Sequence, residues 1–428
     1  MRSKARRGAA ALSALMAIGL ALTACSESRA ADVALPSQVE AELPGETVDQ
    51  LRGAVDQAVQ ASGATGAIVG VWVPWSGTWV AGVGTTEPEG AGSEVTTDMS
   101  FRIGDVTRAM TCDVLYDLAK EGTLDLGDSI AEHVPSVPDL AAEDPGDITL
   151  QQLCDGTSGL GESWSTAADA VYTTPAREWN PRELASYGLA QERGVPGAAY
   201  RDSDVAYLLL GQALENASGH RASTLMNQYV FEPGGLRQTA LPGDAAAVPS
   251  TTSRHLPGYV SSQADRDAGC VAPADYSELS ASVGFTDSGV VSTIGDLGRY
   301  GQILAANSLA EKDNGRFDHN LPVNPDADTW FQYGGGAFQA GTLLGQQGSI
   351  PGYAASVWAD PATGMAVAVV LNNSASEGGI VGLLGRELAA IASKAPAASG
   401  QTQPEFGLPW TAESMHEAVA ASAICPIG

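Results

Sequence analysis

Residues 101–108 read Phe-Arg-Ile-Gly-Asp-Val-Thr-Arg, and a largely apolar stretch follows them as far as Gly122. This stretch predicts a buried helix over residues 105–121. Asp105 opens the helix, where a carboxylate can accept backbone N–H groups and meet the positive end of the helix dipole. Arg108 lies three residues later on the same side, so the two charges are expected to pair. The pattern therefore places an ion pair at the head of a buried helix.

Segments typical of strands lie toward both ends of the chain, and helical segments fill the middle. Apolar spacing predicts helices at residues 47–61, 148–153, 205–217 and 379–393. Runs rich in β-branched residues predict strands at residues 67–73, 78–83, 337–344, 353–359 and 365–371. Short turns join two pairs of these strands into hairpins. We therefore expect an α+β fold, with one antiparallel sheet built from both chain ends and a helical lobe inserted between them.

The first 46 residues have the composition of a targeting leader and a tether. Four basic residues precede an apolar run over residues 8–22, which is too short for an ordinary transmembrane helix. The run ends in Leu22-Thr23-Ala24-Cys25, which resembles a bacterial lipobox. The resemblance implies removal of residues 1–24 and a lipid on Cys25, whereas a plain secreted protein is the alternative. Residues 25–46 then form a tether, residues 47–395 the main domain, and residues 396–428 a linker with a short helix.

Composition and charge limit the partners. Hydrophobic residues make up 44% of the 428 and charged residues 17%, which suits a globular core. The net charge of −28 becomes about −32 once the four positive charges of residues 1–24 are removed. Such a surface repels nucleic acid and anionic lipid headgroups, and solubility outside the cell is the explanation that we prefer for it.

Four cysteines remain besides Cys25, namely Cys112, Cys154, Cys270 and Cys425. An even number in an exported chain suggests two disulfides, for which three pairings are open. The spacing of the cysteines gives no C-x-x-C metal motif, and we expect neither a metal nor a cofactor.

Several ordered motifs resemble the serine β-lactamase and D-Ala-D-Ala carboxypeptidase family. Residues 101–108 resemble the family's F-R-I-G-S-V-T-K, and residues 148–160 resemble its I-T-L-R-Q-L-L-S-H-T-S-G-L. Residues 288–297 and the stretches Pro351-Gly352-Tyr353 and Leu371-Asn372-Asn373-Ser374 follow in the family's order. The resemblance covers roughly residues 47–393. It implies the β-lactamase/transpeptidase-like fold and places Cys154 near the helix of Cys112, which favours the pairs Cys112–Cys154 and Cys270–Cys425.

The same alignment departs from the family at the positions that carry the chemistry. The nucleophilic serine of the family corresponds to Asp105, and its general-base lysine to Arg108. Arginine stays protonated in proteins and cannot accept a proton at neutral pH. The family's Tyr-Ser-Asn falls on residues 202–204, which read Asp-Ser-Asp, and its His-x-Gly falls on residues 346–348, which read Gln-Gln-Gly. The resemblance thus implies a degenerate catalytic centre in which no residue is catalytic.

These positions should still converge on one cleft. The expected lining consists of Asp105, Arg108, Asp202, Ser203, Asp204, Gln346, Gly348 and Ser349. Asp105, Asp202 and Asp204 around Arg108 predict either a self-satisfied salt-bridge network or a site for a cationic group or a metal ion such as Ca²⁺. Hydrolysis with Asp105 as nucleophile is the remaining alternative. The aromatics Tyr333, Phe338 and Tyr353 could line the same cleft.

Three functions are consistent with this sequence. The first is a lipid-anchored pseudoenzyme at the extracytoplasmic face of the cell membrane, binding a peptide, a cell-wall fragment or an envelope protein. The second is an active peptidase, esterase or β-lactamase with altered catalytic residues, and the third is a structural envelope component.

Overall fold

The computed structural model describes residues 35–427 except 138–140, 142–143, 311–314 and 327, so Cys25 and the leader lie outside the described residues. Within this part of the chain the main sheet has eight antiparallel strands in the order β2-β1-β12-β11-β10-β9-β8-β7. Its strands are β1 (Gly66–Val73), β2 (Gly77–Gly84), β7 (Leu321–Pro322), β8 (Phe331–Gly334), β9 (Ala337–Ala340), β10 (Leu343–Ile350), β11 (Tyr353–Ala359) and β12 (Ala366–Leu371). Since β1 pairs with β12, the two chain ends meet in the sheet, as predicted.

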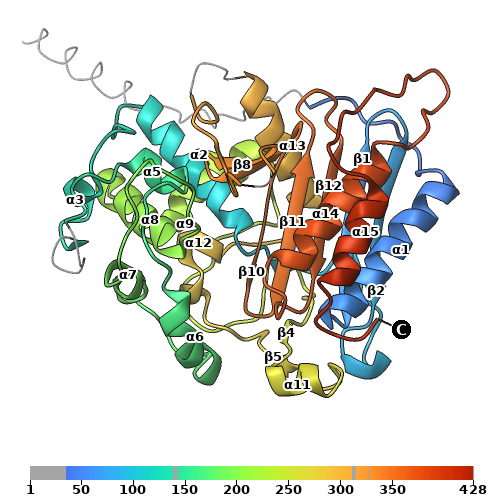
Figure 1. Cartoon of the computed structure of the whole chain (residues 1–428), viewed down its shortest axis with the longest axis horizontal. Coiled ribbons are helices and arrows are strands. Elements are labelled where there is room, and N and C mark those ends of the chain that lie inside the picture. Colours follow the sequence, from blue (N-terminus) through green and yellow to red (C-terminus); the bar gives the residue numbers. More distant parts are fainter. Residues whose placement is uncertain (1–34, 138–140, 142–143, 311–314, 327, 428) are drawn as a thin grey trace, which may run out of the picture.

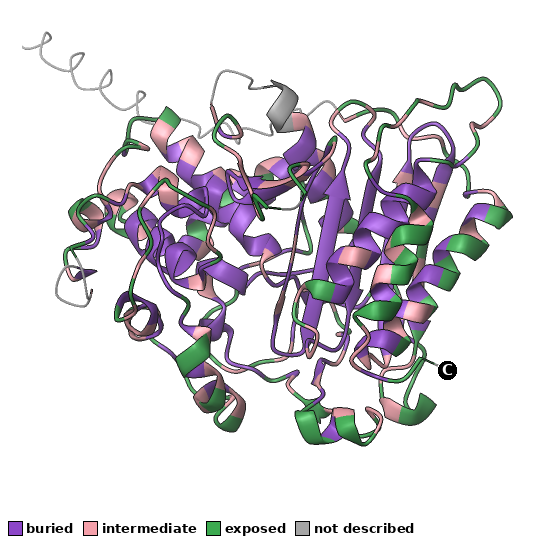
Figure 2. Ribbon diagram, in the orientation of Figure 1, coloured by how far each residue is buried: buried purple, intermediate pink, exposed green. Residues whose placement is uncertain are grey.

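Helices cover both faces of this sheet (Figure 1). Gly301 of α13 (Ile294–Ala310) faces Val357 of β11, whereas Gly385 of α14 (Gly379–Ala392) faces the next residue, Trp358. Successive residues of a strand point to opposite faces, so α13 and α14 lie on opposite sides. Accordingly β11 and β12 are buried along their whole length (Figure 2).

The helical lobe lies between β2 and β7 in the chain and forms the left part of Figure 1. Its longest helices are α2 (Val106–Lys120) and α8 (Asp204–Ser218), both close to the expected bounds. The shorter ones are α3 (Ile130–His133), α5 (Leu150–Cys154), α6 (Trp164–Thr173), α7 (Pro181–Leu189), α9 (Ala222–Met226), η2 (Asn227–Phe231), α10 (Glu232–Gly234), η3 (Ala281–Val283) and α12 (Phe285–Ser288). The short helix α11 (Gln263–Asp267) lies apart from them, at the bottom of Figure 1 below the sheet. Three further short elements are η1 (Pro88–Gly90) and two small sheets, β3 (Phe101–Arg102) with β6 (Val291–Ser292) and β4 (Tyr259–Val260) with β5 (Ala274–Asp275). The α+β prediction with an inserted lobe is confirmed.

The prediction of a single strand over residues 337–344 is wrong, because this segment contains all of β9 and the start of β10. Gly341 has φ 56° and forms the turn between β9 and β10. A left-handed backbone conformation is readily adopted by glycine, so the apolar run bends there. β10 then continues to Ile350, which carries its second half to the head of α2.

The C-terminal extension packs against the right-hand side of the molecule as drawn in Figure 1. Its helix α15 (Ala412–Ala421) contacts α14 and α1 (Gly45–Ser62), and Trp410 donates its indole N–H to the carbonyl of Arg386. Both expected disulfides are present, Cys112–Cys154 and Cys270–Cys425. Among the described residues, no helix is both long enough and apolar enough to cross a bilayer.

Candidate functional site

A cavity of ≈ 690 Å³ opens where the helical lobe meets the sheet. Its walls come from the heads of α2 and α8, the chain before and within α6, α12, the second half of β10, and the segments that follow β4 and β12. Of the predicted lining, the structure brings together Asp105, Arg108, Asp202, Asp204, Gly348 and Ser349. We refer to this cavity as the cleft.

Two glycines let β10 run directly against the head of α2. Gly104 has φ 55°, and a Cβ on it would lie 2.9 Å from the backbone of Ser349. A Cβ on Gly348 would lie 2.1 Å from an Oδ of Asp105. The Asp105 carboxylate is therefore wedged between the helix head and the strand.

Asp105 occupies the N-cap position of α2, but it does not cap the helix as expected. Within the described chain its side chain makes no hydrogen bond to the first-turn amides. Its Oδ2 instead faces Arg108, with Nη2 at 3.7 Å. Asp105 thus takes part in the charge network of the cleft and leaves the first turn without a side-chain cap.

Arg108 is the centre of this network. Its Nε donates to Asp287 at 2.8 Å and its Nη1 to Asp202 at 2.5 Å, while its guanidinium lies 5.0 Å from the ring centre of Tyr207. The Arg108 side chain is 7% exposed, so these contacts are made largely out of water. The attraction of Asp105, Asp202 and Asp287 outweighs burial and raises the pKa of Arg108 well above its ordinary value. The guanidinium therefore stays charged.

Sequence analysis expected Asp105, Asp202 and Asp204 around Arg108, but the structure has Asp287 in the place of Asp204. Asp287 of α12 pairs with Arg108, whereas Asp204 accepts the backbone N–H of Ser163 at 2.8 Å and also the Ser163 hydroxyl. Burial raises the pKa of Asp204 to about 6, and the nearby Asp287 adds to the effect.

The other buried carboxylates of the cleft also bind protons more readily than in water. Burial raises the pKa of Asp105 well above its ordinary value, against the lowering effect of Arg108, and Asp287 and Asp202 raise it further. Burial also raises the pKa values of Asp287 and Glu162. Desolvation disfavours the charged form of an acid, and here several acids share one guanidinium.

Two predicted lining residues, Ser203 and Gln346, lie beneath the cleft surface. Ser203 caps α8: its hydroxyl accepts the N–H of Ala206 and donates to the carbonyl of Gly161. Gln346 is fully buried, and its amide donates to Tyr333 Oη and to the carbonyl of Gly336. Both side chains have structural partners, and the neighbouring Gln347 lines the cleft instead.

The cleft also contains groups that sequence analysis missed. Trp164 and Tyr172 of α6 and Tyr276 form a chain of edge-to-face rings, with centroids 5.6 Å and 5.3 Å apart. Tyr200 lines the same cavity, and its hydroxyl lies 3.4 Å from Asp202. Of the three aromatics proposed from sequence, Phe338 lines the cleft, whereas Tyr333 and Tyr353 are buried in the core. The position of Tyr200, two residues before Asp202, was a signal available in the sequence.

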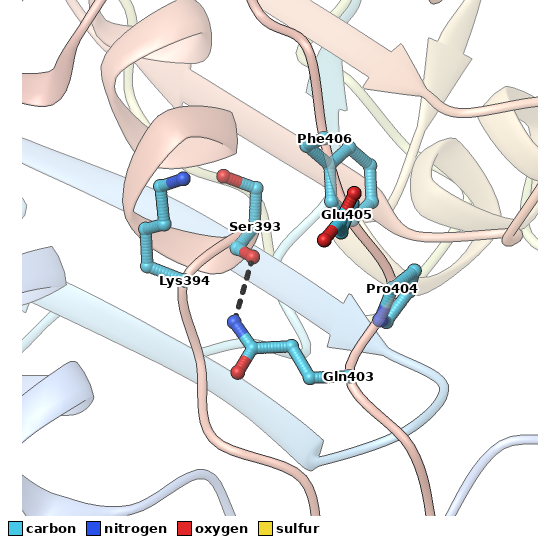
Figure 3. Close-up of a pocket in the computed structure, with 6 residues that line it drawn as sticks. All are labelled: Ser393, Lys394, Gln403, Pro404, Glu405 and Phe406. Atoms are coloured by element: carbon cyan, nitrogen blue, oxygen red, sulfur yellow. Dashed lines mark hydrogen bonds between the residues drawn. The ribbon is translucent and has the colours of Figure 1, made fainter.

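A second cavity, of ≈ 440 Å³, lies between the end of α14 and the C-terminal extension (Figure 3). It is lined by Ser393, Lys394, Gln403, Pro404, Glu405 and Phe406, and shares no residue with the cleft. The Gln403 amide donates to the carbonyl of Ser393, and the Ser393 hydroxyl donates to that of Ala390. The serine is thus engaged in closing the helix end.

Over the described residues, no group of three or more His, Cys, Asp or Glu side chains is arranged to hold a metal ion. The carboxylates around Arg108 already converge on a positive charge, which occupies the place that a cation would take.

A fold with this sheet and lobe, and a cleft at the head of α2, defines a family of hydrolases. Residues 51–390 match the family model described as Beta-lactamase, and the chain belongs to that family.

Two curated relatives are similar over part of their length. The D-alanyl-D-alanine-carboxypeptidase/endopeptidase AmpH of Escherichia coli strain K12 is 28% identical over 50% of this chain and 54% of its own. A D-aminopeptidase of Cereibacter sphaeroides is 26% identical over 71% of this chain and 57% of its own. The chain therefore spans little more than half the length of these relatives.

Solved structures share the fold at lower identity. A D-stereospecific amidohydrolase from a Streptomyces species aligns with a TM-score of 0.65 and 24% identity, covering 76% of this chain and 95% of the other. The octameric penicillin-binding protein homologue from Pyrococcus abyssi gives a TM-score of 0.61 at 18% identity, covering 78% and 75%.

Proposed function

We propose that this protein is a non-catalytic member of the Beta-lactamase family that binds a ligand in the cleft, in a binding or regulatory role at the cell envelope. The resemblance of residues 101–108 to the family's serine-x-x-lysine helix puts Asp105 in the place of the nucleophile and Arg108 in the place of the base. An acyl-transfer enzyme of this kind needs an activated nucleophile beside a group that can accept its proton.

The ion pairing of Arg108 carries the proposal. A guanidinium held by Asp202 and Asp287, with Asp105 at 3.7 Å, is fixed in its protonated form. It cannot serve as a general base, and the carboxylate beside it is partly neutralised by it. The two residues stabilise each other, which fits a cleft in which binding has been kept and acyl transfer lost.

The cleft's charge suggests the class of ligand. Asp105, Asp202 and Asp287 share the charge of Arg108, and Asp204, Glu162 and Glu377 add three further carboxylates to the lining. The other cation in the described lining is Arg266, so carboxylates outnumber guanidiniums six to two. An ammonium group on the ligand would offset this excess, and the ring chain of Trp164, Tyr172 and Tyr276 offers faces for it or for an apolar side chain. The names of the two relatives point to compounds of D-amino acids. We therefore propose a peptide or cell-wall fragment with a free amino group.

The membrane attachment is part of the same proposal. Cys25 follows Leu-Thr-Ala at residues 22–24, and a lipid on its sulfur would hold the protein at the extracytoplasmic face of the membrane. Metabolic labelling with a fatty acid tests this: the natural chain should carry the label and the Cys25→Ser variant should not.

Covalent capture tests the loss of catalysis. The purified protein is incubated with a fluorescent penicillin, and its intact mass is measured beside that of an active carboxypeptidase of the family. We expect no adduct under conditions that label the active relative fully. A stoichiometric adduct would refute the proposal and support the alternative, an active hydrolase with altered residues, and mapping the modified side chain would identify its nucleophile.

Calorimetry with a matched pair of probes tests the ligand class. D-alanyl-D-alanine amide carries a free ammonium group, and its N-acetyl derivative lacks it. We expect the first to bind at least about tenfold more tightly, with the difference reduced in Asp204→Asn. Equal affinities would exclude the ammonium group as the feature recognised.

A further inference from the structure

One wall of the cleft is a segment that the family alignment did not single out, residues 261–276, which we call the lip. Six of its residues line the cavity, namely Ser261, Ser262, Gln263, Arg266, Ala274 and Tyr276. Its regular structure amounts to the five-residue helix α11 and the two-residue strand β5. A segment of this kind needs attachments to the body if it is to keep a fixed position.

The two ends of the lip are attached by side chains. At the start, Asn373 accepts the N–H of Ser261 and donates its amide to the Ser261 hydroxyl and to the carbonyl of Gly63. At the end, Tyr276 donates its hydroxyl to the carbonyl of Tyr172. These contacts tie the lip to the end of β12, to the α1–β1 connection and to α6.

The middle of the lip is folded largely on itself. The side-chain carboxylate of Asp265 accepts the N–H of Ala272 at 2.6 Å, and the backbone carbonyl of Asp265 accepts the N–H of Cys270 at 2.8 Å. Cys270 has φ 61°, a conformation that costs about 1 kcal/mol or more for a residue with a side chain. Arg266 reaches the carbonyl of Ala375 at 3.4 Å, which is a long hydrogen bond.

A covalent link connects this middle part to the body. Cys270 is bonded to Cys425, and the N–H groups of Ile424 and Cys425 both point to the carbonyl of Ala61 at the end of α1. Figure 1 shows the C-terminus at the same end of the molecule as α11, beside the ends of α1 and α15. The C-terminal extension, which packs against α14 and α1, is thus joined covalently to the cleft wall.

We propose that the Cys270–Cys425 disulfide is a redox-sensitive tether, through which the C-terminal extension positions the lip and so shapes the cleft. The two disulfides differ in access: Cys112 and Cys154 are both fully buried, whereas in the other bond Cys425 is buried and only Cys270 is half-buried. A dithiol reductant attacks the sulfur of the half-buried Cys270, forms a mixed disulfide with it and releases the Cys425 thiol. It then closes to its own disulfide, leaving Cys270 as a thiol too. Two electrons and two protons pass from the dithiol to the protein. The released lip then exchanges between its closed position and open ones.

This inference concerns the wall of the cleft, and it stands whether or not the proposed ligand is right. Its experiment is hydrogen exchange on the protein with its C-terminal extension, before and after mild treatment with dithiothreitol, with each disulfide counted by differential alkylation and mass spectrometry. We expect Cys270–Cys425 to open while Cys112–Cys154 stays intact. We also expect amides of residues 263–277 and 374–377 to exchange at least about tenfold faster, with α2 and α8 unchanged.

The Cys270→Ser/Cys425→Ser double variant is the matched control, because it lacks the bond without any reductant. It should reproduce the fast exchange of the lip and show no further change with dithiothreitol. An unchanged lip in both the reduced protein and the variant would overturn the proposal, as would equal opening of the two disulfides. Faster exchange spread evenly over the whole protein would also overturn it, since that result marks a bond that stabilises the fold globally.

Discussion

The sheet and the cleft lie side by side and are built from opposite kinds of residue. β11 and β12 are buried from end to end and are composed almost wholly of Ala, Val, Leu and Trp, with Ser356 and Tyr353 as the polar exceptions. The described lining of the cleft, a short distance away at the head of α2, gathers six carboxylates. The apolar sheet defines the family, while the cleft decides what the molecule does with the fold. We expect that the sheet and the cleft can be changed separately, and the following variants test this expectation.

A substitution in the core of the sheet is expected to lower the free energy of unfolding the most. Trp358 is 1% exposed and packs between α14 and the rings of Phe331 and Phe338. Trp358→Ala removes this burial and leaves a cavity, so the free energy of unfolding should fall by about 4 kcal/mol. Urea denaturation followed by circular dichroism measures it. A loss below about 1 kcal/mol would show that the sheet repacks freely. That result would contradict the description of the sheet as the closely packed part that defines the fold.

Removing the central charge of the cleft should cost nearly as much. Arg108→Met leaves Asp287 and Asp105 buried without their partner, and breaking a buried ion pair from one side costs about 3 kcal/mol. The loss should be smaller at pH 5 than at pH 7.5, because carboxylates without a partner can take up protons. A loss that is equal at the two pH values would mean that the carboxylates do not depend on Arg108.

Much of the fold could be predicted from the chain, because its motifs are local. Asp105 and Arg108 are three residues apart on one helix, so their pairing follows from helix geometry. Asp287 joins them from 179 positions further along, and local spacing gives no sign of such a contact. The resemblance aligned the positions but could not orient the side chains, so Gln346 was expected in the cleft and lies beneath it.

Ser203 illustrates a signal that was present and was outweighed. It stands directly before the apolar run that forms α8, which is where a serine caps a helix. The alignment with the family's second motif favoured a cleft position instead. The lip could not be predicted as a wall of the cleft, because its position depends on hydrogen bonds to Asn373, more than 100 residues away in the sequence. The disulfide from Cys270 to Cys425 was expected, but that pairing alone does not place residues 261–276 at the cleft.

Replacing one buried carboxylate should change the free energy of unfolding by less than the two variants above, and should raise it instead of lowering it. The pKa of Asp204 is raised from 3.8 to about 6, so the folded state holds its proton more tightly than the unfolded state does. Stability therefore falls as the pH rises from about 4 to 6 and stays low above that. Asp204→Asn removes the charge and should be about 1–2 kcal/mol more stable than the natural protein at pH 7.5, with no gain at pH 4.

Asp155 offers a matched control for that variant. Burial raises its pKa to about 6 as well, but it lies outside the cleft lining and accepts the N–H of Gly335. Asp155→Asn should flatten the same pH dependence while leaving ligand binding unchanged. Thermal melts across pH 4–8 measure both variants, and a natural protein whose stability rises between pH 4 and 6 would contradict the raised pKa values.

The smallest effect is expected from an ion pair on the surface. Arg177 and Glu183 lie 2.6 Å apart, as close as the pairs of Arg108, but their side chains are 42% and 35% exposed. Water and salt screen such a pair, and holding two long side chains costs entropy, so Glu183→Gln should change the free energy of unfolding by at most about 0.5 kcal/mol. Urea denaturation at low and high salt measures the change beside that of Arg108→Met. Since the two pairs have similar distances, a large difference between the variants assigns the effect to burial, whereas similar losses would remove the distinction between the cleft and the rest of the charged surface.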